Sequence, residues 1–177
     1  MKKIVAFAGS NSAQSINKQL VTWAANQAEG IESTVLDLND FEMPIFSIDR
    51  EKDSGIHQLA KDFKETLQSA DGIMISFAEH NGNVSTAFKN IYDWMSRLGA
   101  PIWMNKPMMV MATSPGQRGG KSVLEIVTSS FPRRGAEIAS SFSLPSFNEN
   151  FENSKGISNP ELKAEFEEAL AKFVKAL

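Results

Sequence analysis

The residues best suited to chemistry are the small hydroxyl and amide side chains of residues 9–17. An apolar run, residues 4–8, comes before them, and Leu20 and Ala24 follow at the spacing of a helix. A strand, a polar loop and a helix N-terminus can hold a phosphate without Lys or Arg. The N–H groups of the first helical turn point at the loop, and the helix dipole adds roughly half a positive charge there. The alternative is an ordinary strand-to-helix turn in which Ser15 caps the helix.

Two further polar loops follow apolar runs of the same kind. Residues 78–83 come after the run 73–77, and residues 113–120 come after the run 108–112. In an open parallel sheet, ligands bind at the carboxyl ends of the strands. We therefore expect the three loops to meet at one edge of a sheet and to form one site.

Strands and helices alternate along the whole chain. Two more strands are expected at 33–38 and 135–144, and amphipathic helices at 54–67, 84–98, 123–131 and 159–177. This alternation is typical of an α/β protein whose parallel strands form an open doubly wound sheet. We expect a single domain over residues 1–177, with no linker inside it.

The ends of several helices can be predicted from single residues. Gly30 stands where the first helix would have its C-cap, Ser54 is the expected N-cap of the second, and Asn159 that of the last. Residues 41–53 lack a regular period although they carry apolar side chains. We expect this segment to be a loop that folds back on its own domain.

The composition excludes several classes of site and partner. A net charge of −3 gives no electrostatic reason to expect nucleic acid or an anionic membrane as a partner. The chain has no cysteine, so disulfides, thiolate catalysis and cysteine-based metal sites are excluded. No apolar run approaches the ~20 residues that span a bilayer, and the first residues do not form a signal peptide, so we expect a cytoplasmic protein.

Common nucleotide and catalytic motifs are not matched. Only Gly9 of a GxGxxG dinucleotide fingerprint is present, and a P-loop ending at residues 120–122 would need a glycine where Pro115 stands. A phosphoacceptor receiver domain needs acidic residues at the end of the first strand, which this chain lacks there. The two histidines, His57 and His80, provide neither a metal site nor a catalytic triad.

Three other side chains could belong to a site or an interface. Glu79 is the only carboxylate of its loop and a candidate general base, although a carboxylate at a loop end is more often solvated. Trp94 and Trp103 flank a short connection. We expect Trp94 in the core and Trp103 in an interface between subunits.

Taken together, three segments resemble the NADPH-dependent FMN reductase family. They are Gly9-Ser10-Asn11-Ser12-Ala13-Gln14-Ser15-Ile16-Asn17, the stretch from Glu79-His80-Asn81-Gly82 to Trp94, and Ser114-Pro115-Gly116-Gln117-Arg118-Gly119-Gly120. The resemblance covers about the first three quarters of the chain, and the second segment is its most specific part. It implies a flavodoxin-like fold of five parallel strands in the order 2-1-3-4-5, with helices on both faces, noncovalent FMN, and a homodimer or homotetramer.

The resemblance also implies which residues would hold the cofactor. The FMN phosphate would be held by Ser10, Ser12, Ser15, Ile16 and Asn17. The isoalloxazine ring would lie along Glu79, His80, Asn81 and Gly82, chiefly against their backbone groups, with Ser114, Gly116, Gln117 and Gly119 on its other side. Arg118 would meet the extra phosphate of NADPH; the alternative is an ordinary surface arginine.

The chain departs from the family pattern in two loops. The first loop of the family usually carries an arginine where this chain has Ser12, and the second usually reads Pro-Glu-Tyr where this chain has Ala78, Glu79 and His80. The first departure bears on affinity for phosphate and NADPH, and the second bears on the shape of the ring pocket.

Flavin chemistry would explain why no acid–base constellation is found, because the cofactor carries the difficult steps. The resemblance implies hydride transfer from NADPH or NADH through FMN to a small acceptor: a quinone, a flavin, an azo compound or a metal oxyanion. Two alternatives share the fold. One is an electron carrier of the flavodoxin type, and the other is a flavin-free regulatory relative.

Overall fold

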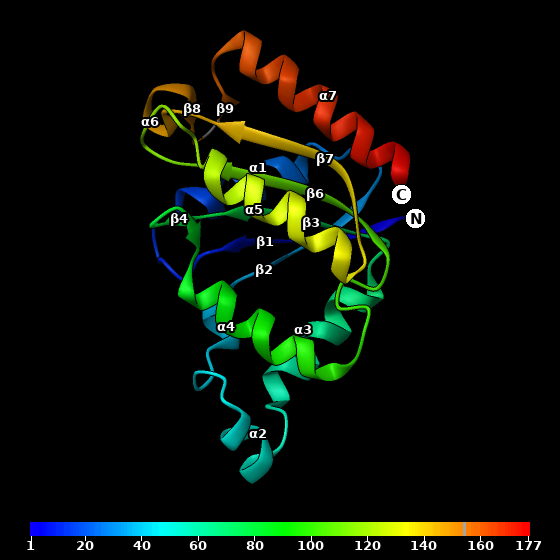
Figure 1. The fold of residues 1–177 in the computed structure, drawn as a ribbon. Helices are drawn as coiled ribbons and strands as arrows, with labels where there is room; N and C mark the ends of the chain where they lie inside the picture. Colours follow the sequence, from blue (N-terminus) through cyan, green and yellow to red (C-terminus); the bar gives the residue numbers. More distant parts are fainter. Residues whose placement is uncertain (154) are drawn as a thin grey trace.

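A five-stranded parallel sheet runs through the middle of the molecule (Figure 1). The computed structural model describes residues 1–153 and 155–177. The strands are β1 (Lys3–Gly9), β2 (Glu32–Leu36), β3 (Gly72–Phe77), β6 (Lys106–Thr113) and β7 (Ala136–Leu144). Their spatial order is β2-β1-β3-β6-β7, which confirms the order 2-1-3-4-5 and the doubly wound α/β class.

Helices cover both faces of this sheet and bury two separate apolar layers. On one face α1 (Ile16–Asn26) and α7 (Pro160–Ala176) pack on Ile4, Ala6 and Ala8. On the other face α3 (Gln58–Ser69), α4 (Thr86–Met95) and α5 (Lys121–Ser130) pack on Val5 and Phe7. Successive side chains of a strand point to opposite faces, so β1 supplies both layers and is apolar throughout. Burial of each large apolar side chain contributes about 1.5–3 kcal/mol.

Two predicted helix ends are wrong. Ser54 is the last residue of α2 (Ile48–Ser54), and α3 is capped by His57, whose Nδ1 accepts the N–H of Leu59 at 3.2 Å. Helix α2 could not be predicted from the sequence pattern, because none of its residues is buried and it therefore has no apolar stripe. At the other position, α1 ends at Asn26, and Gly30 lies in the turn before β2 with φ 72°.

The connection from β2 to α2 folds back on its own domain, as predicted, and packs on α4, but the end of the segment predicted as a loop forms α2. A short 3-10 turn, Leu38–Phe41, opens it. The side chain of Asn90 then donates to the carbonyl oxygen of Met43 at 3.0 Å and accepts the N–H of Phe46 at 2.8 Å. Trp94 adds a bond from Nε1 to the carbonyl oxygen of Pro44 at 2.8 Å.

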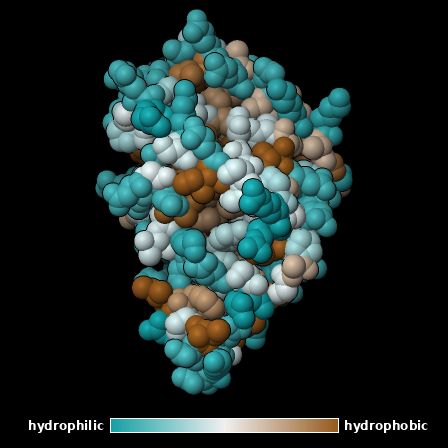
Figure 2. Space-filling model, viewed as in Figure 1, coloured by the Kyte–Doolittle hydropathy of each residue, from teal (hydrophilic) through white to brown (hydrophobic). Residues whose placement is uncertain are grey.

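This connection and α2 project from the sheet and carry exposed apolar side chains. The α2 end protrudes at the bottom of Figure 1, and Figure 2 shows apolar surface over it. Ile45 is 67% exposed and Ile48 is 56% exposed. In the part of the chain that the structure describes, no helix is long and apolar enough to cross a membrane.

The two tryptophans that flank residues 95–102 both lie inside the subunit. Trp94 is buried, as predicted. Trp103 is wholly buried in its own chain, so its expected placement in a subunit interface is wrong. Its ring lies 4.7 Å from that of Phe131 and 5.5 Å from that of Tyr92, which places it in the core under α4 and α5.

Candidate functional site

The three polar loops meet at the carboxyl edge of the sheet, as predicted, and enclose a cavity of about 220 Å³. Eight of the residues expected in the site line it: Ser10, Ser12, Ser15, Ile16, Asn17, Glu79, His80 and Ser114. Gln14, Ala78, Thr113 and Pro115, which had no predicted role, complete the lining. The cavity therefore contains groups from the ends of β1, β3 and β6, the three central strands.

The first loop presents hydrogen-bond donors to this cavity. The hydroxyl oxygen of Ser15 accepts the N–H of Lys18 at 3.1 Å and so caps α1, while that of Ser10 accepts the N–H of Ser12 at 3.2 Å. A serine hydroxyl that accepts one bond still has its own proton to donate. The N–H groups of Ile16 and Asn17 have no partner among the residues that the structure describes. The loop can therefore offer several donors to an anion.

No lysine or arginine of the described residues lines the cavity, so an anion here would be held by dipoles and hydroxyl groups. Lys18, in the first turn of α1, forms an ion pair with Asp37 beyond β2. That ion pair, with the N–H of Asn39, holds the pKa of Asp37 below its ordinary value. The charge of Lys18 is thus neutralised by a carboxylate.

Asn17, in the first turn of α1, bonds to two of the three central strands, β3 and β6, at this edge. Its Oδ1 accepts the N–H of Thr113 at 3.0 Å and the hydroxyl of Ser76 at 2.7 Å, and its Nδ2 donates to the carbonyl oxygen of Thr113 at 3.1 Å. The side chain is buried. Its side-chain amide therefore fixes α1 to β3 and β6.

The second loop, predicted only as a polar loop, is a β-hairpin. Strands β4 (Glu79–His80) and β5 (Asn83–Val84) pair antiparallel around Asn81 and Gly82. These two have φ values of 53° and 73°, and an Asn-Gly pair with both φ positive is the favoured two-residue hairpin turn. The Asn-Gly pair was therefore an available sequence signal that was missed.

The side chain of Glu79 is held at the start of α5. Its Oε2 accepts the N–H of Val123 at 3.0 Å, and Gly120, at the N-cap position, offers no side chain for that purpose. A carboxylate at a helix N-terminus interacts favourably with the helix dipole. The half-buried carboxylate of Glu79 therefore fixes the second loop to the start of α5.

The third loop contributes less of its length to the cavity than predicted. Gly116, Gln117 and Gly119 are outside the lining, as are Asn81 and Gly82 of the hairpin. Gly119 is buried with φ 55°, and a Cβ there would lie 2.5 Å from the hydroxyl oxygen of Ser143, so β7 constrains this loop closely. Arg118 is exposed, and its Nη2 donates to the hydroxyl of Ser122 at 3.0 Å.

Sequence reasoning missed Ser85, which ties the hairpin to β1. Its hydroxyl donates to the carbonyl oxygen of Gly9 at 2.8 Å and accepts the N–H of Phe88 at 3.2 Å, so it caps α4. The side chain is almost wholly buried. A serine directly before an amphipathic helix is a typical N-cap signal, which could have identified it.

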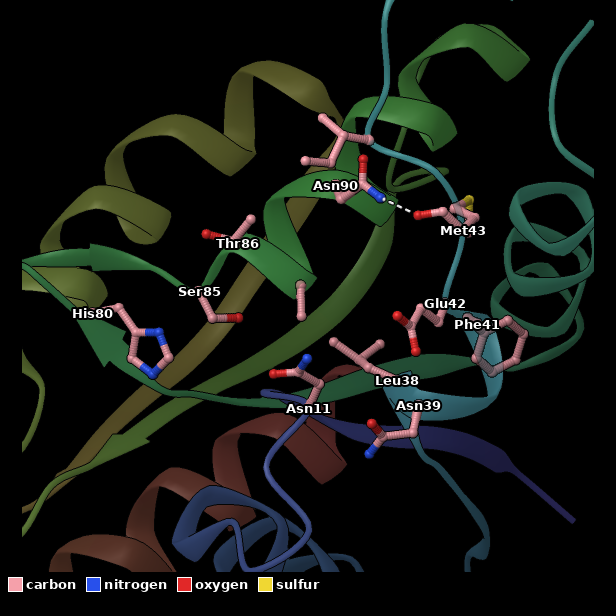
Figure 3. A pocket seen from close by; sticks show the side chains of 12 residues that line it. Asn11, Leu38, Asn39, Phe41, Glu42, Met43, His80, Ser85, Thr86 and Asn90 are labelled. Carbon is pink, nitrogen blue, oxygen red and sulfur yellow. Dashed lines mark hydrogen bonds between the residues drawn. The ribbon is translucent and has the colours of Figure 1, made fainter. Parts of the chain in front are cut away.

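A second cavity, of about 210 Å³, is drawn in Figure 3 and shares His80 with the first. It is bounded by Asn11 of the first loop, by the connection that follows β2, and by the start of α4. Its lining mixes apolar and amide side chains: Asn11, Leu38, Asn39, Phe41, Glu42, Met43, Ile45, His80, Ser85, Thr86, Ala87 and Asn90.

Comparison with known sequences gives consistent relatives. A 2-hydroxy-1,4-benzoquinone reductase of a Burkholderia species is 35% identical over 119 residues, which are 66% of this chain and 63% of that protein. An NADPH:quinone oxidoreductase of Arabidopsis thaliana is 27% identical over 124 residues, 68% of this chain and 62% of that protein. The chain thus spans about six tenths of the length of these curated relatives.

Solved structures share the fold. The flavoenzyme FerB of Paracoccus denitrificans, an NAD(P)H:acceptor oxidoreductase, superposes with a TM-score of 0.79 at 22% identity, over 99% of this chain and 97% of that one. An oxidised flavodoxin of Bacillus cereus gives 0.55 at 18% identity, over 100% and 99%. The sequence profile of the NADPH-dependent FMN reductases matches residues 2–170. The chain is a member of the NADPH-dependent FMN reductase family, with a flavodoxin-like fold.

Proposed function

We propose that this protein is an FMN-dependent NAD(P)H oxidoreductase that reduces a small acceptor, most directly a quinone. The observation that carries the proposal is the three-loop cavity, where hydroxyl groups and unpartnered N–H groups gather at the carboxyl edge of the sheet. Family membership supports the same cofactor. The named activities of the Burkholderia and Arabidopsis relatives favour a quinone over an azo compound, a flavin or a metal oxyanion.

The first loop has the donors that a phosphate needs. Hydroxyls of Ser10, Ser12 and Ser15 and the N–H groups of Ile16 and Asn17 would hold the phosphate of FMN. Hydrogen bonds to a charged group contribute roughly 1.5–3 kcal/mol each, so three or four of them are enough to hold the phosphate without a cation.

The second and third loops would hold the ring. The proposed contacts are the backbone of Glu79, His80, Asn81 and Gly82 on one side, and Ser114, Gly116, Gln117 and Gly119 on the other. Bound FMN would supply the two-electron chemistry between nicotinamide and acceptor. The chain's own contribution would be to orient the ring and to direct N–H groups at its oxygen atoms. Arg118, exposed beside this loop, would meet the phosphate of NADPH.

We further propose that the protein is cytoplasmic, since NAD(P)H is the reductant of the cell interior. We also propose that it forms a homodimer or a homotetramer. Ile45 and Ile48 are exposed apolar side chains just before and at the start of α2, and exposed apolar surface of this kind is typical of an interface. Light scattering during gel filtration tests the assembly state. An Ile45→Glu, Ile48→Glu double variant is expected to elute as a monomer.

The absorption spectrum of freshly purified protein tests the cofactor and the reductase activity together. We expect a flavin band that bleaches when NADPH is added without oxygen and returns when a quinone is added. A preparation that remains colourless in excess FMN would contradict the proposal. Flavin that is bound but not bleached by NADPH or NADH would instead indicate an electron carrier of the flavodoxin type.

A further inference from the structure

His80 lies where the two cavities adjoin. Of the residues that the structure describes, it alone lines both the three-loop cavity and the second cavity. Its side chain is exposed, and no described group hydrogen-bonds the imidazole. Both ring nitrogens are therefore available to a ligand in either cavity.

The second cavity has fixed walls and the chemistry to hold a small flat ring. Asn90 and Trp94 anchor the segment 43–46 that forms one wall, as the bond from Asn90 to Met43 in Figure 3 shows. Leu38, Phe41 and Met43 supply apolar contacts, while the amides of Asn11 and Asn39 supply polar ones. His80 lies across the cavity from Phe41 and Glu42 (Figure 3).

The other charged groups around His80 are few. Glu79 precedes it in β4, and its carboxylate is held by the N–H of Val123. Glu42 lines the opposite side of the second cavity, and no lysine or arginine of the described chain lines either cavity. Imidazole is the side chain that can most readily give up and regain a proton near neutral pH. His80 is thus the available proton donor at this junction.

We propose that His80 protonates the acceptor as it is reduced, an inference that rests on the proposed quinone reductase function. Conversion of a quinone to a hydroquinone takes two electrons and two protons. In the proposed reductase, NAD(P)H and bound FMN would together supply a hydride, which is both electrons and one proton. The imidazolium of His80 gives the second proton to a quinone oxygen, so that an O–H bond forms and an N–H bond breaks. Water then restores the proton to the imidazole.

A comparison of two electron acceptors, a quinone and ferricyanide, distinguishes a proton-donating role of His80 from a structural one. Reduction of a quinone consumes protons, whereas ferricyanide takes electrons alone. In His80→Gln, the quinone rate divided by the ferricyanide rate is expected to fall about a hundredfold, the scale of general acid catalysis, and the pH dependence of this ratio is expected to flatten. His57→Gln is the matched control, because His57 is the other histidine and caps α3 away from both cavities. It is expected to leave the ratio unchanged.

Equilibrium binding gives a readout that does not need turnover. The phenolate of 4-nitrophenol resembles a deprotonated hydroquinone, and nitrobenzene is its neutral counterpart. By calorimetry on FMN-loaded protein, His80→Gln is expected to weaken 4-nitrophenolate about tenfold and nitrobenzene less than twofold. Equal weakening of both would overturn the inference.

The outcomes distinguish the two proposals. If the unaltered protein reduces both acceptors and His80→Gln keeps the quinone-to-ferricyanide ratio, the role of His80 is wrong and the reductase function stands. If the unaltered protein loaded with FMN oxidises NAD(P)H with neither acceptor, the reductase function is wrong and the role of His80 falls with it.

Discussion

The side chain of Asn17 pairs with both backbone polar groups of Thr113, accepting its N–H at 3.0 Å and donating to its carbonyl oxygen at 3.1 Å. A third bond, from the hydroxyl of Ser76, reaches the same amide at 2.7 Å. This buried group therefore holds α1 against β3 and β6 at the point where the first loop ends and the third loop begins.

Asn17→Ala is expected to lower the free energy of unfolding by about 3 kcal/mol. The substitution leaves buried groups of Thr113 and Ser76 without partners, and each such group costs about 1–3 kcal/mol. Urea unfolding measures the change. Ser76→Ala is the control, because it removes a single bond and is expected to cost about 1 kcal/mol. Equal losses in the two variants would contradict the central role given to Asn17.

Glu79→Ala is expected to weaken FMN binding about tenfold, or roughly 1.4 kcal/mol. The variant releases the hairpin from the N-terminus of α5, so the two loops proposed to flank the ring are no longer joined. Glu79→Gln keeps an oxygen that can accept the N–H of Val123 and is expected to weaken binding only about threefold, since the dipole term is about 0.3–1 kcal/mol. Quenching of flavin fluorescence measures both.

Glu125→Ala is the control for Glu79. It removes the same charge from an exposed position of α5 and is expected to leave FMN affinity unchanged. A loss with Glu125→Ala as large as that with Glu79→Ala would show that overall charge, and not the anchored hairpin, determines affinity.

Ser12→Arg is expected to tighten FMN binding about tenfold, because a charge-assisted hydrogen bond is roughly twice as strong as a neutral one. The cavity has no cation of its own among the described lining residues. Riboflavin lacks the phosphate, so its affinity is expected to stay the same, which makes the ratio of the two dissociation constants the decisive measurement. Asn26→Arg adds the same charge at the far end of α1 as a control.

Asp37→Asn is expected to destabilise the protein at pH 6 by at most about 1 kcal/mol, since both partners of the Lys18–Asp37 pair are partly exposed. The ion pair and the N–H of Asn39 lower the pKa of Asp37 from 3.8 in the folded state. The folded state therefore binds the proton more weakly than the unfolded one, and the stabilisation is present above pH 3.8 and is lost as the pH falls through the folded pKa.

Urea unfolding of Asp37→Asn and of the unaltered protein at pH 6 and pH 3 checks this sign. The difference between them is expected to shrink at the lower pH. A difference that grows on acidification would show that another group is responsible.

The three central strands were predictable because they are buried on both faces, so each reads as a largely apolar run such as residues 73–77. The boundaries of α2 were not, because a helix with no buried face has no period to detect. The predicted location of Trp103, in an interface between subunits, was wrong for a related reason. Burial of its ring depends on Phe131 and Tyr92, which only the folded chain brings to it.

Convergence of the three loops followed from topology, since the ends of parallel strands share one edge. The contacts that fix those loops could not be predicted from the topology, because each joins residues far apart in the sequence. Glu79 and Val123 are 44 positions apart, and Asn17 and Thr113 are 96 apart. Ser85 could have been identified as a local cap, but its bond to Gly9 is a product of the fold.

The bonds of Asn17, Glu79 and Ser85 hold the loops through groups of the chain itself. A recess whose walls are held by such bonds within the chain loses little conformational entropy on association. Flavin analogues altered in the tail or the ring should then differ in dissociation rate far more than in association rate. Reconstitution would proceed in one kinetic phase, with no slow rearrangement after the encounter.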